Sequence, residues 1–494
     1  MRPTRTAAAV AAVLAAVAAG PLATAQPAVA APAPVPAPAK LSDDFNGDGY
    51  RDLVLLGGTY QKDYRVDVVY GTANGPGTRV QTIHQSQAAI PGTTEEGDFF
   101  GQSATSADLD RDGYADLIVA SPGEAVGTAT RRGGLTVVWG GPGGLGSGTV
   151  FHSPVPVANT DQKQGDAFGR EVVAGDFDGD GDQDLAAVSE SRDGGVVLLK
   201  GPFTRAGKTA GHALLGKNYG LLQVDRLVAG RVDADSATDL YIVGDDTSDS
   251  DNDEHAYLHR GGAAFATRAS SVRIPDPSPK TGAFSRGPVA AALGDFDKDG
   301  YGDLAVGRAA APNDKERGYV VVQYGGATGP NTARKPVKFT QDTAGVPGVS
   351  ENGDLFGYSL AAGDVNDDGY ADLAVGAPGE DLGSARDAGA VTVLFGRAGG
   401  LTGTGSKAYD QNKPGIGGSV ERDDNFGNDL RMADYNRDGR ADLMVETDDW
   451  VGNKLGMVHL LKGSASGITG TGSKDYTANS LKLSYNTFGG WFAR

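Results

Sequence analysis

The chain of 494 residues contains no cysteine, which excludes disulfide bridges and thiolate metal sites. It has only six histidines, and none lies in a metalloprotease H-E-x-x-H motif. The nucleophile motif G-x-S-x-G and the phosphate-binding motif G-x-x-x-x-G-K-[ST] are also missing. The sequence therefore carries no recognisable catalytic signature, and we expect a protein that is not an enzyme.

Long hydrophobic runs are missing too. The uncharged run Ala7–Ala19 is too short to cross a bilayer, but it follows two arginines and precedes small residues, which is the order of a secretory signal peptide. We therefore predict a signal peptide over 1–25, with cleavage between 25 and 31, and an Ala/Pro-rich linker over 26–40. The expected product is a secreted protein without a transmembrane segment, whose folded domain spans 41–494.

Basic residues are few relative to acidic ones. The chain has 44 Lys and Arg against 63 Asp and Glu, which gives a formal net charge of −19. Nucleic acid is therefore not expected as a partner, because phosphate binding needs a basic surface. Helix signals are scarce, whereas 76 glycines separate short runs rich in Val and Leu. This pattern predicts an all-β fold.

Six copies of one nine-residue pattern, D-x-[DN]-x-D-G-x-x-D, recur along the chain, and an apolar residue follows each copy. The gap after the third copy holds a damaged seventh, in which Arg231 stands at the first position and Ser236 replaces the glycine. Successive copies begin 64, 68, 55, 64, 69 and 70 residues apart, which indicates a repeat architecture. The copies begin at Asp44, Asp108, Asp176, Arg231, Asp295, Asp364 and Asp434.

Each repeat carries more than its acidic loop. A Phe-Gly pair precedes four of the loops, a strand follows every loop, and a second apolar strand ends in glycine, as in Leu135–Gly140. With a weaker fourth strand, this predicts a seven-bladed β-propeller of four-stranded antiparallel blades. The loop at Asp44 lacks a preceding Phe-Gly, whereas the tail has Phe488–Gly489 without a following loop. We therefore expect pairing of the N- and C-terminal segments to close the ring, which hides strand edges.

The acidic loops have the composition of calcium sites. Oxygen side chains occupy positions 1, 3, 5 and 9, glycine at position 6 permits a left-handed backbone, and position 7 can add its main-chain carbonyl. Hard oxygen ligands favour Ca²⁺ over transition metals. The alternative to calcium sites is that these loops are solvated acidic turns. We expect about six structural Ca²⁺ ions. The predicted ligands are Asp44, Asn46, Asp48, Tyr50, Asp52, Asp108, Asp110, Asp112, Tyr114, Asp116, Asp176, Asp178, Asp180, Asp182, Asp184, Asp295, Asp297, Asp299, Tyr301, Asp303, Asp364, Asn366, Asp368, Tyr370, Asp372, Asp434, Asn436, Asp438, Arg440 and Asp442.

The Phe-Gly pairs, the acidic loops and the Gly-Ala-Pro element at Gly376–Pro378 resemble the FG-GAP repeats of the integrin α-subunit N-terminal propeller and its secreted bacterial relatives. The resemblance covers Leu41 to Arg494 and implies a calcium-binding propeller with a role in extracellular adhesion. The fourth repeat departs from the pattern because it lacks both the Phe-Gly pair and an intact loop. The fifth has Phe284-Ser-Arg-Gly287 instead of a well-spaced pair. Calcium is therefore in question only at the fourth repeat.

The loops that join strands 2 and 3 of each unit, and those that lead from strand 4 to the next unit, emerge on the face opposite the acidic loops. Such variable loops on a rigid ring often carry recognition. Aromatic and arginine side chains dominate many interfaces, so we select Tyr60, Arg131, Arg132 and Trp450 as candidate ligand-binding residues, although ordinary surface decoration is the alternative for each.

Three functional classes remain open. The first is an extracellular, monomeric adhesion or recognition module that binds a protein or a glycan. The second is a polysaccharide lyase or glycoside hydrolase working from the propeller face, since paired acids for glycoside chemistry are not excluded by an Asp-rich sequence. The third is a structural component of a cell wall or matrix.

Overall fold

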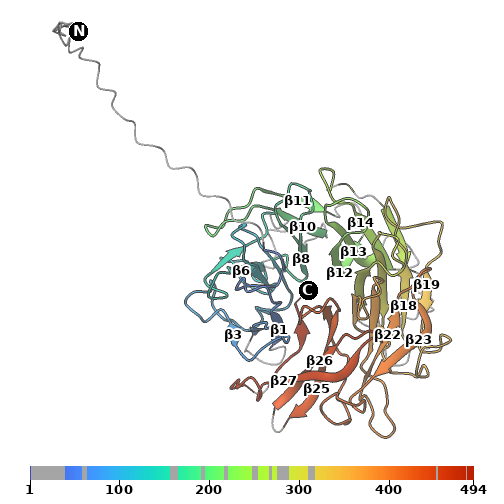
Figure 1. The fold of residues 1–494 in the computed structure, drawn as a ribbon. Coiled ribbons are helices and arrows are strands. Elements are labelled where there is room, and N and C mark those ends of the chain that lie inside the picture. The colour runs from blue at the N-terminus through green and yellow to red at the C-terminus, as the bar shows by residue number, and fades with distance from the viewer. Residues whose placement is uncertain are drawn as a thin grey trace. The chain divides into compact units, whose positions relative to one another are not determined.

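The structure is a computed structural model, and its propeller is built from strands, turns and bends (Figure 1). No α-helix occurs among the described residues, so within this part of the chain no helix is available to cross a membrane. The structure describes residues 1, 39–57, 64–155, 165–190, 195–215, 221–246, 254–265, 267, 270–274, 289–309, 317–451, 454–485 and 487–493.

In the described part of the chain, twenty-eight strands form seven sheets of four strands each, which confirms the predicted blades. Blade 1 holds β28 (Trp491–Phe492), β1 (Leu53–Gly57), β2 (Arg65–Val69) and β3 (Val80–Ile83). Blade 2 holds β4 (Ala104–Ala107), β5 (Asp116–Ser121), β6 (Gly134–Val138) and β7 (Gly148–Phe151). Blade 3 holds β8 (Val172–Gly175), β9 (Asp184–Ser189), β10 (Gly195–Lys200) and β11 (Gly211–Leu215).

The remaining four blades follow the same order along the chain. Blade 4 holds β12 (Leu221–Gly230), β13 (Asp239–Asp246), β14 (Glu254–His259) and β15 (Ser270–Ile274). Blade 5 holds β16 (Val289–Gly294), β17 (Asp303–Arg308), β18 (Tyr319–Gln323) and β19 (Val337–Phe339). Blade 6 holds β20 (Leu360–Gly363), β21 (Asp372–Ala377), β22 (Ala390–Phe395) and β23 (Thr402–Tyr409). Blade 7 holds β24 (Leu430–Ala433), β25 (Asp442–Val451), β26 (Lys454–Lys462) and β27 (Thr469–Thr477).

The ring is closed by the two ends of the propeller, as predicted from the unmatched Phe-Gly pair in the tail. The last strand, β28, pairs antiparallel with β1, with Phe492 opposite Leu55 and Trp491 opposite Leu56. All pairings within the blades are antiparallel, so every described blade is a meander whose first strand lies nearest the axis. The chain therefore supplies blade 1 from both of its ends.

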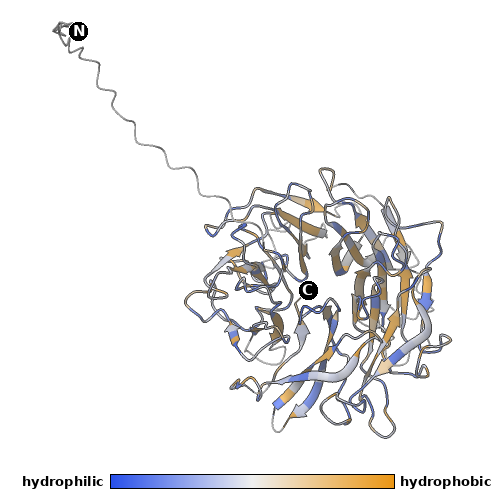
Figure 2. Cartoon of the chain, in the orientation of Figure 1, coloured by the Kyte–Doolittle hydropathy of each residue, from blue (hydrophilic) through white to orange (hydrophobic). Residues whose placement is uncertain are grey.

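The hydrophobic core is divided into seven clusters, and each cluster combines residues of two neighbouring blades. Alternation along β1 explains this, because successive side chains of a strand point to opposite faces. Leu53 and Leu55 pack against blade 7, whereas Val54 and Leu56 pack against blade 2. Figure 2 shows the hydrophobic residues concentrated along the strands. Both faces of a blade are thus buried.

The phenylalanines of the Phe-Gly pairs anchor the loops that lead into each blade. Phe100 is 1% exposed, and the glycine after it, Gly101, has a φ of 89°, a left-handed conformation that disfavours other residues. The N–H of Gly101 donates to the carbonyl of Ala120 in β5 at 2.9 Å. Phe284–Gly287 lies outside the described residues. Equivalent buried phenylalanines are Phe168, Phe356, Phe426 and Phe488.

Substituting Phe100 by alanine is expected to lower the free energy of unfolding by about 3–5 kcal/mol, because it leaves a cavity between blades 1 and 2. The adjacent Phe99 is 42% exposed and is the matched control, for which we expect less than about 1 kcal/mol from Phe99→Ala. Urea denaturation followed by tryptophan fluorescence measures both. Equal losses for the two variants would contradict a specific role for the Phe-Gly phenylalanine.

Candidate metal centre

The acidic loops join the first and second strands of their blades, except in blade 1, where the loop leads into β1. Hydrogen bonds within each loop set its curl. In the second blade, the carboxylate of Asp108 at position 1 accepts the N–H groups of Asp112 and Gly113, both at 3.1 Å. Asp112 at position 5 in turn accepts the N–H of Tyr114 at 3.1 Å. The same position-1 pattern occurs at Asp44, Asp295, Asp364 and Asp434. These contacts turn the side-chain oxygens inward around a small space.

Two positions of the loop have a left-handed backbone. Glycine at position 6 has a φ of 83–93° in all six intact loops, as the curl requires. Position 4 is also left-handed in all six, which the sequence pattern did not indicate. There, two loops use glycine and four use a residue for which this conformation is strained. The residues at position 4 are Gly47, Arg111, Gly179, Lys298, Asp367 and Arg437.

The aspartate at position 9 is the most buried acidic residue of each loop and ties the loop to the blade. Asp116 accepts the N–H of Leu109 at 2.9 Å on one oxygen and that of Gly140 at 2.8 Å on the other. Its side chain is inaccessible to solvent, and this burial raises the pKa of Asp116 to about 8. Burial likewise raises the pKa of Asp52, Asp303 and Asp372 to about 7 and that of Asp184 to about 6.

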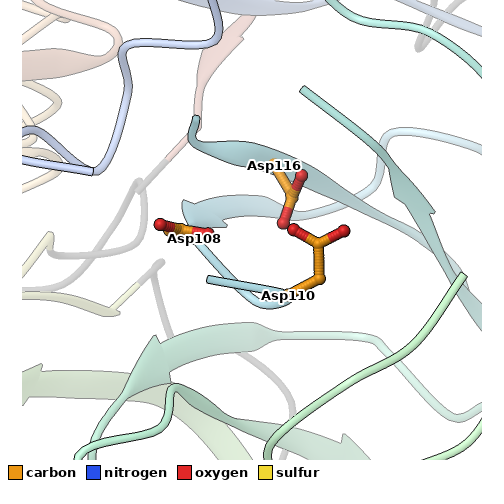
Figure 3. Close-up of side chains that lie close together, drawn as sticks. All are labelled: Asp108, Asp110 and Asp116. Atoms are coloured by element: carbon orange, nitrogen blue, oxygen red, sulfur yellow. The ribbon is translucent and has the colours of Figure 1, made fainter. Parts of the chain in front are cut away.

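Carboxylates from positions 1, 3 and 9 come together at the start of β5 (Figure 3). Ligand oxygens of Asp108, Asp110 and Asp116 all lie within 4.8 Å of one another. The third and fifth loops hold comparable groups, Asp176 with Asp178 and Asp184, and Asp295 with Asp297 and Asp299.

Each of these three loops also contains a buried oxygen without a hydrogen-bond partner. Oδ1 of Asp110, Asp178 and Asp297 is buried and unpaired, although burying an unsatisfied carboxylate oxygen is costly. The oxygens at position 9 already accept N–H groups, but a carboxylate oxygen has a second lone pair to offer. An inward-facing set of hard oxygens with unmet capacity fits Ca²⁺. The donor set therefore agrees with the predicted calcium sites.

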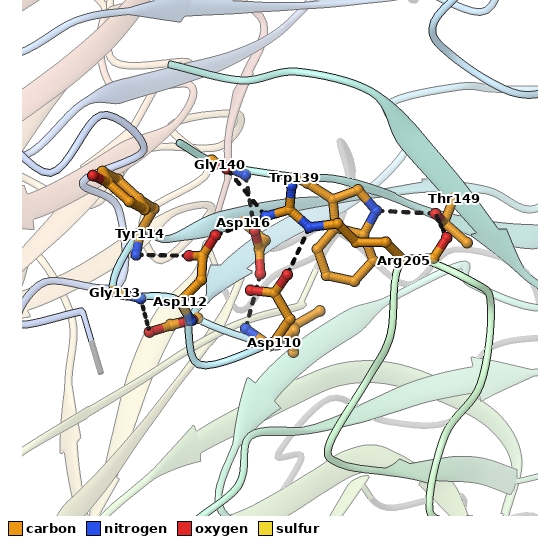
Figure 4. Close-up of polar contacts among 11 residues, drawn as sticks. Asp110, Asp112, Gly113, Tyr114, Asp116, Trp139, Gly140, Thr149 and Arg205 are labelled. Atoms are coloured by element: carbon orange, nitrogen blue, oxygen red, sulfur yellow. Dashed lines mark hydrogen bonds and ion pairs between the residues drawn. The ribbon is translucent and has the colours of Figure 1, made fainter. Parts of the chain in front are cut away.

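The other oxygen at position 3 faces a basic side chain. Arg205 donates to Oδ2 of Asp110 and to Oδ2 of Asp112, both at 2.7 Å, while its guanidinium lies 5.4 Å from the ring centre of Trp139 (Figure 4). Where position 3 is aspartate, a basic side chain is present: Arg205, Lys200, Arg260 and Arg334 pair with Asp110, Asp178, Asp233 and Asp297. Position 3 is an uncharged asparagine in the other three intact loops, and in the seventh loop a basic side chain, Lys462, instead pairs with Asp442 at position 9, at 3.2 Å. Each aspartate at position 3 thus has a basic partner.

The fourth loop differs in its backbone as well as its sequence. Neither Ala234 nor Ser236, at positions 4 and 6, adopts a left-handed conformation. Asp233 is 2% exposed and is held by Arg260, whose Nε lies 2.5 Å from its Oδ2. With Arg231 at position 1, this loop lacks one of the oxygen side chains that the others share, and a guanidinium supplies positive charge.

Neighbouring loops contact one another around the ring, from position 4 of one loop to position 7 of the next. The contact is an ion pair, a cation–π contact or close packing, according to the residues present. The pairs are Gly47 with Tyr114, Arg111 with Asp182, Gly179 with Ala237, Lys298 with Tyr370, Asp367 with Arg440, and Arg437 with Tyr50. The last pair crosses the closure of the ring.

In the ion-free protein, the buried carboxyls at position 9 should make stability fall as pH rises. Burial raises the pKa of these carboxyls above the ordinary aspartate value of 3.8, to about 6 for Asp184 and about 8 for Asp116, so the native state binds more protons than the unfolded state across that window. We expect a higher melting temperature at about pH 5 than at about pH 8 when divalent ions have been removed by dialysis. Differential scanning calorimetry tests this, and a higher melting temperature at the alkaline pH would contradict it.

The residues predicted to contact a partner lie in different settings. Tyr60 lies outside the described residues. Trp450 is 62% exposed, and Arg131 is exposed near Glu190 at 3.4 Å. Arg132 is largely buried: it pairs with Asp166 at 2.5 Å and donates to two main-chain carbonyls. Trp450 and Arg131 are therefore available to a partner, whereas Arg132 already has internal partners.

Parts of the chain resemble known proteins in sequence. A model of the FG-GAP repeat matches residues 100–151, 287–322 and 356–394, and one of the FG-GAP-like repeat matches residues 44–119. The chain is 34% identical over 227 residues to integrin alpha-PS2 of Drosophila melanogaster, a match that covers 43% of this chain and 15% of that protein. It is 33% identical over 114 residues to phosphatidylinositol-glycan-specific phospholipase D of Mus musculus, covering 22% and 13%. The chain thus spans less than a fifth of either relative.

Among solved structures, the Dos1 propeller aligns with 89% of this chain and 87% of its own, at 11% identity and a TM-score of 0.41. A likeness this weak supports no conclusion about fold or function. The repeat matches and the arrangement of the blades carry the assignment instead. The chain is therefore a seven-bladed β-propeller that contains FG-GAP repeats, with integrin α subunits among its sequence relatives.

Proposed function

We propose that the chain is a secreted, monomeric, calcium-loaded propeller that recognises an extracellular protein or glycan and does not itself catalyse a reaction. The observation that carries the calcium assignment is the set of buried, unpaired carboxylate oxygens at position 3. Each faces carboxylates from positions 1 and 9 or 1 and 5, so a divalent cation would satisfy several buried oxygens at once.

In this proposal, residues 1–25 direct export, residues 26–40 are a spacer, and the propeller from residue 41 onward is the functional domain. Extracellular calcium is abundant enough to fill weak sites, with dissociation constants on the order of 10⁻⁴–10⁻³ M. The ions act as structural parts of the ring. Recognition falls to the opposite face, where Trp450 and Arg131 are exposed and Tyr60 is a further candidate.

Relatives of the repeats include integrin α subunits, which favours recognition over catalysis. The partner class is tested by screening the calcium-loaded protein on arrays of glycans and of extracellular proteins. Saturable binding to a member of either array supports the proposal. Release of unsaturated sugars from a polysaccharide panel would contradict it and favour a lyase.

A matched pair of substitutions tests the calcium sites. We expect the wild-type protein to bind six Ca²⁺ ions and Asp297→Ala to bind one fewer, because the substitution removes the unpaired buried oxygen that Asp297 supplies. Asp233→Ala is the control: it alters the same position of the fourth loop, where Arg260 stands in for an ion. Native mass spectrometry at millimolar calcium gives the stoichiometry. A loss of one ion in the Asp233 variant, or none in the Asp297 variant, would contradict the assignment.

A further inference from the structure

Blade 2 contains a cavity of about 230 Å³ on the face opposite the acidic loops. It lies between the loop that leads from β3 into blade 2 and the loop that joins β5 to β6. The space is on the order of 15 times what one water molecule needs, so it can hold a small organic ligand. Its polar lining residues are Gln85, Ser121, Glu124, Thr136 and His152; we refer to it below as the Gln85 cavity.

Two buried polar atoms in the wall of the Gln85 cavity have no hydrogen-bond partner. Gln85 is 4% exposed and donates from Nε2 to Oε2 of Glu124 at 2.6 Å, which leaves its Oε1 unpaired. Ser121 is 2% exposed, and its Oγ is also unpaired. Unsatisfied buried groups are rare in folded proteins because each costs the free energy of its lost hydration. Both side chains border a space from which a ligand could satisfy them.

The rest of the wall combines hydrogen-bond acceptors with an apolar surface. Burial and then the charge of Asp98 raise the pKa of Glu124. Nδ1 of His152 lies 3.0 Å from the carbonyl oxygen of Gly133; a carbonyl only accepts, so Nδ1 donates there. Pro91, Val126 and Val150 supply the apolar part. A fitting ligand therefore has several hydrogen-bond donors and an apolar face.

We propose that the Gln85 cavity binds a single sugar residue of a glycan, with hydroxyl groups donating to Gln85 Oε1 and Glu124 and exchanging a hydrogen bond with Ser121 Oγ. A sugar ring matches the wall because its hydroxyls lie at the edge and its C–H groups form an apolar face. This inference rests on the proposed recognition function and narrows it to one partner class and one site.

Other blades repeat part of this arrangement but not the whole. The pairs Gln341–Glu380 in blade 6 and Gln411–Asp449 in blade 7 form the same type of contact, at 2.5 and 3.1 Å. By strand register, however, His459 in blade 7 stands where Thr136 stands in blade 2, and its larger ring takes up the space. In blade 6, Ala377 replaces Ser121 and removes the hydroxyl. Of these three blades, only blade 2 has both a small residue at the position of Thr136 and a hydroxyl at the position of Ser121.

The test uses a glycan array to find a saccharide that binds, followed by calorimetric titration of the calcium-loaded protein with that saccharide. We expect Ser121→Ala and Glu124→Gln each to weaken binding about tenfold or more. The first substitution removes a hydrogen bond to the ligand, and the second removes the negative charge of a hydrogen-bond acceptor. Glu380→Gln, which makes the same change in blade 6, is the matched control and should leave the affinity within about twofold. If either blade 2 variant retains full affinity, or the control loses as much, the assignment is wrong.

Thermal unfolding separates a binding defect from a folding defect. Removing an unpaired buried hydroxyl should leave stability unchanged or raise it, so Ser121→Ala should melt no lower than the wild type. The saccharide should raise the melting temperature of the wild type but not of that variant. A protein that binds six Ca²⁺ ions and a protein partner, but no saccharide, would overturn this inference while leaving the proposed function intact.

Discussion

Removal of divalent ions with excess chelator is expected to lower the melting temperature of the propeller by on the order of 10 °C at neutral pH. A site filled at about ten times its dissociation constant stabilises the folded state by about 1.4 kcal/mol, so six sites contribute about 8 kcal/mol. That sum is comparable with the whole stability of many domains, about 5–15 kcal/mol. Differential scanning calorimetry with millimolar calcium or with chelator measures the difference.

The charge of the loops gives the physical reason for so large an effect. The six intact loops hold 23 of the 63 acidic residues, and the chain has a formal net charge of −19. Basic side chains such as Arg205 pair with the outward-facing oxygens of the loops, such as Oδ2 of Asp110. Inward-facing oxygens such as Oδ1 of Asp110 have no hydrogen-bond partner. Magnesium at the same concentration is the control, because it prefers fewer protein ligands and should restore less stability. Identical melting curves in calcium and in chelator would refute the calcium sites.

Deleting the chain from Trp491 onward is expected to lower the free energy of unfolding by more than about 4 kcal/mol and to promote association. The deletion removes Phe492, which is 3% exposed in the core between blades 7 and 1, and breaks its N–H bond to Oδ2 of Asp429 at 2.7 Å. It also exposes the edge of β1 along Leu55 and Leu56. Chemical denaturation and size-exclusion chromatography measure the two effects.

Two further variants sharpen this experiment. Phe492→Ala keeps the strand and removes only its buried ring, so we expect a loss of about 3–5 kcal/mol without new association. Trp450→Ala is the control, because Trp450 is 62% exposed, and it should change stability by less than about 1 kcal/mol. A truncated protein that is as stable as the control would show that closure of the ring does not depend on β28.

The fold could be predicted from the sequence because its signals repeat and are local. Each acidic loop marks the start of the second strand of a blade, and runs rich in Val and Leu give the strands. The unmatched Phe488–Gly489 pair in the tail predicted the closure, which β28 confirms. Because the loops, Phe-Gly pairs and apolar strands recur at similar spacing, together they predict the fold more strongly than any one of them does alone.

The loop chemistry could be predicted only in part. Glycine at position 6 is present in every intact copy and indicates its left-handed backbone. The left-handed backbone at position 4 could not be predicted, because most copies have a residue other than glycine there, such as Arg111 or Asp367. Only Gly47 and Gly179 hint at it. The ligand roles of the acidic residues, the signal peptide and the partner-facing residues remain predictions.

Contacts between distant segments could not be predicted. Arg205 follows Asp110 by 95 residues, and no local pattern links the two. Every aspartate at position 3 has a basic partner, but these pairings become visible only in the folded structure. Gln85 and Glu124 are similarly separated and meet only because consecutive blades stack.

Sharing each core between two blades has a consequence for synthesis of the protein. A newly made blade has one hydrophobic face that stays exposed until the next blade emerges from the ribosome. Blade 1 waits longest, because Leu53 and Leu55 are covered only by blade 7, and the edge of β1 is paired only by the last strand. The nascent propeller should therefore be most prone to misassembly just before β28 becomes available to pair with β1.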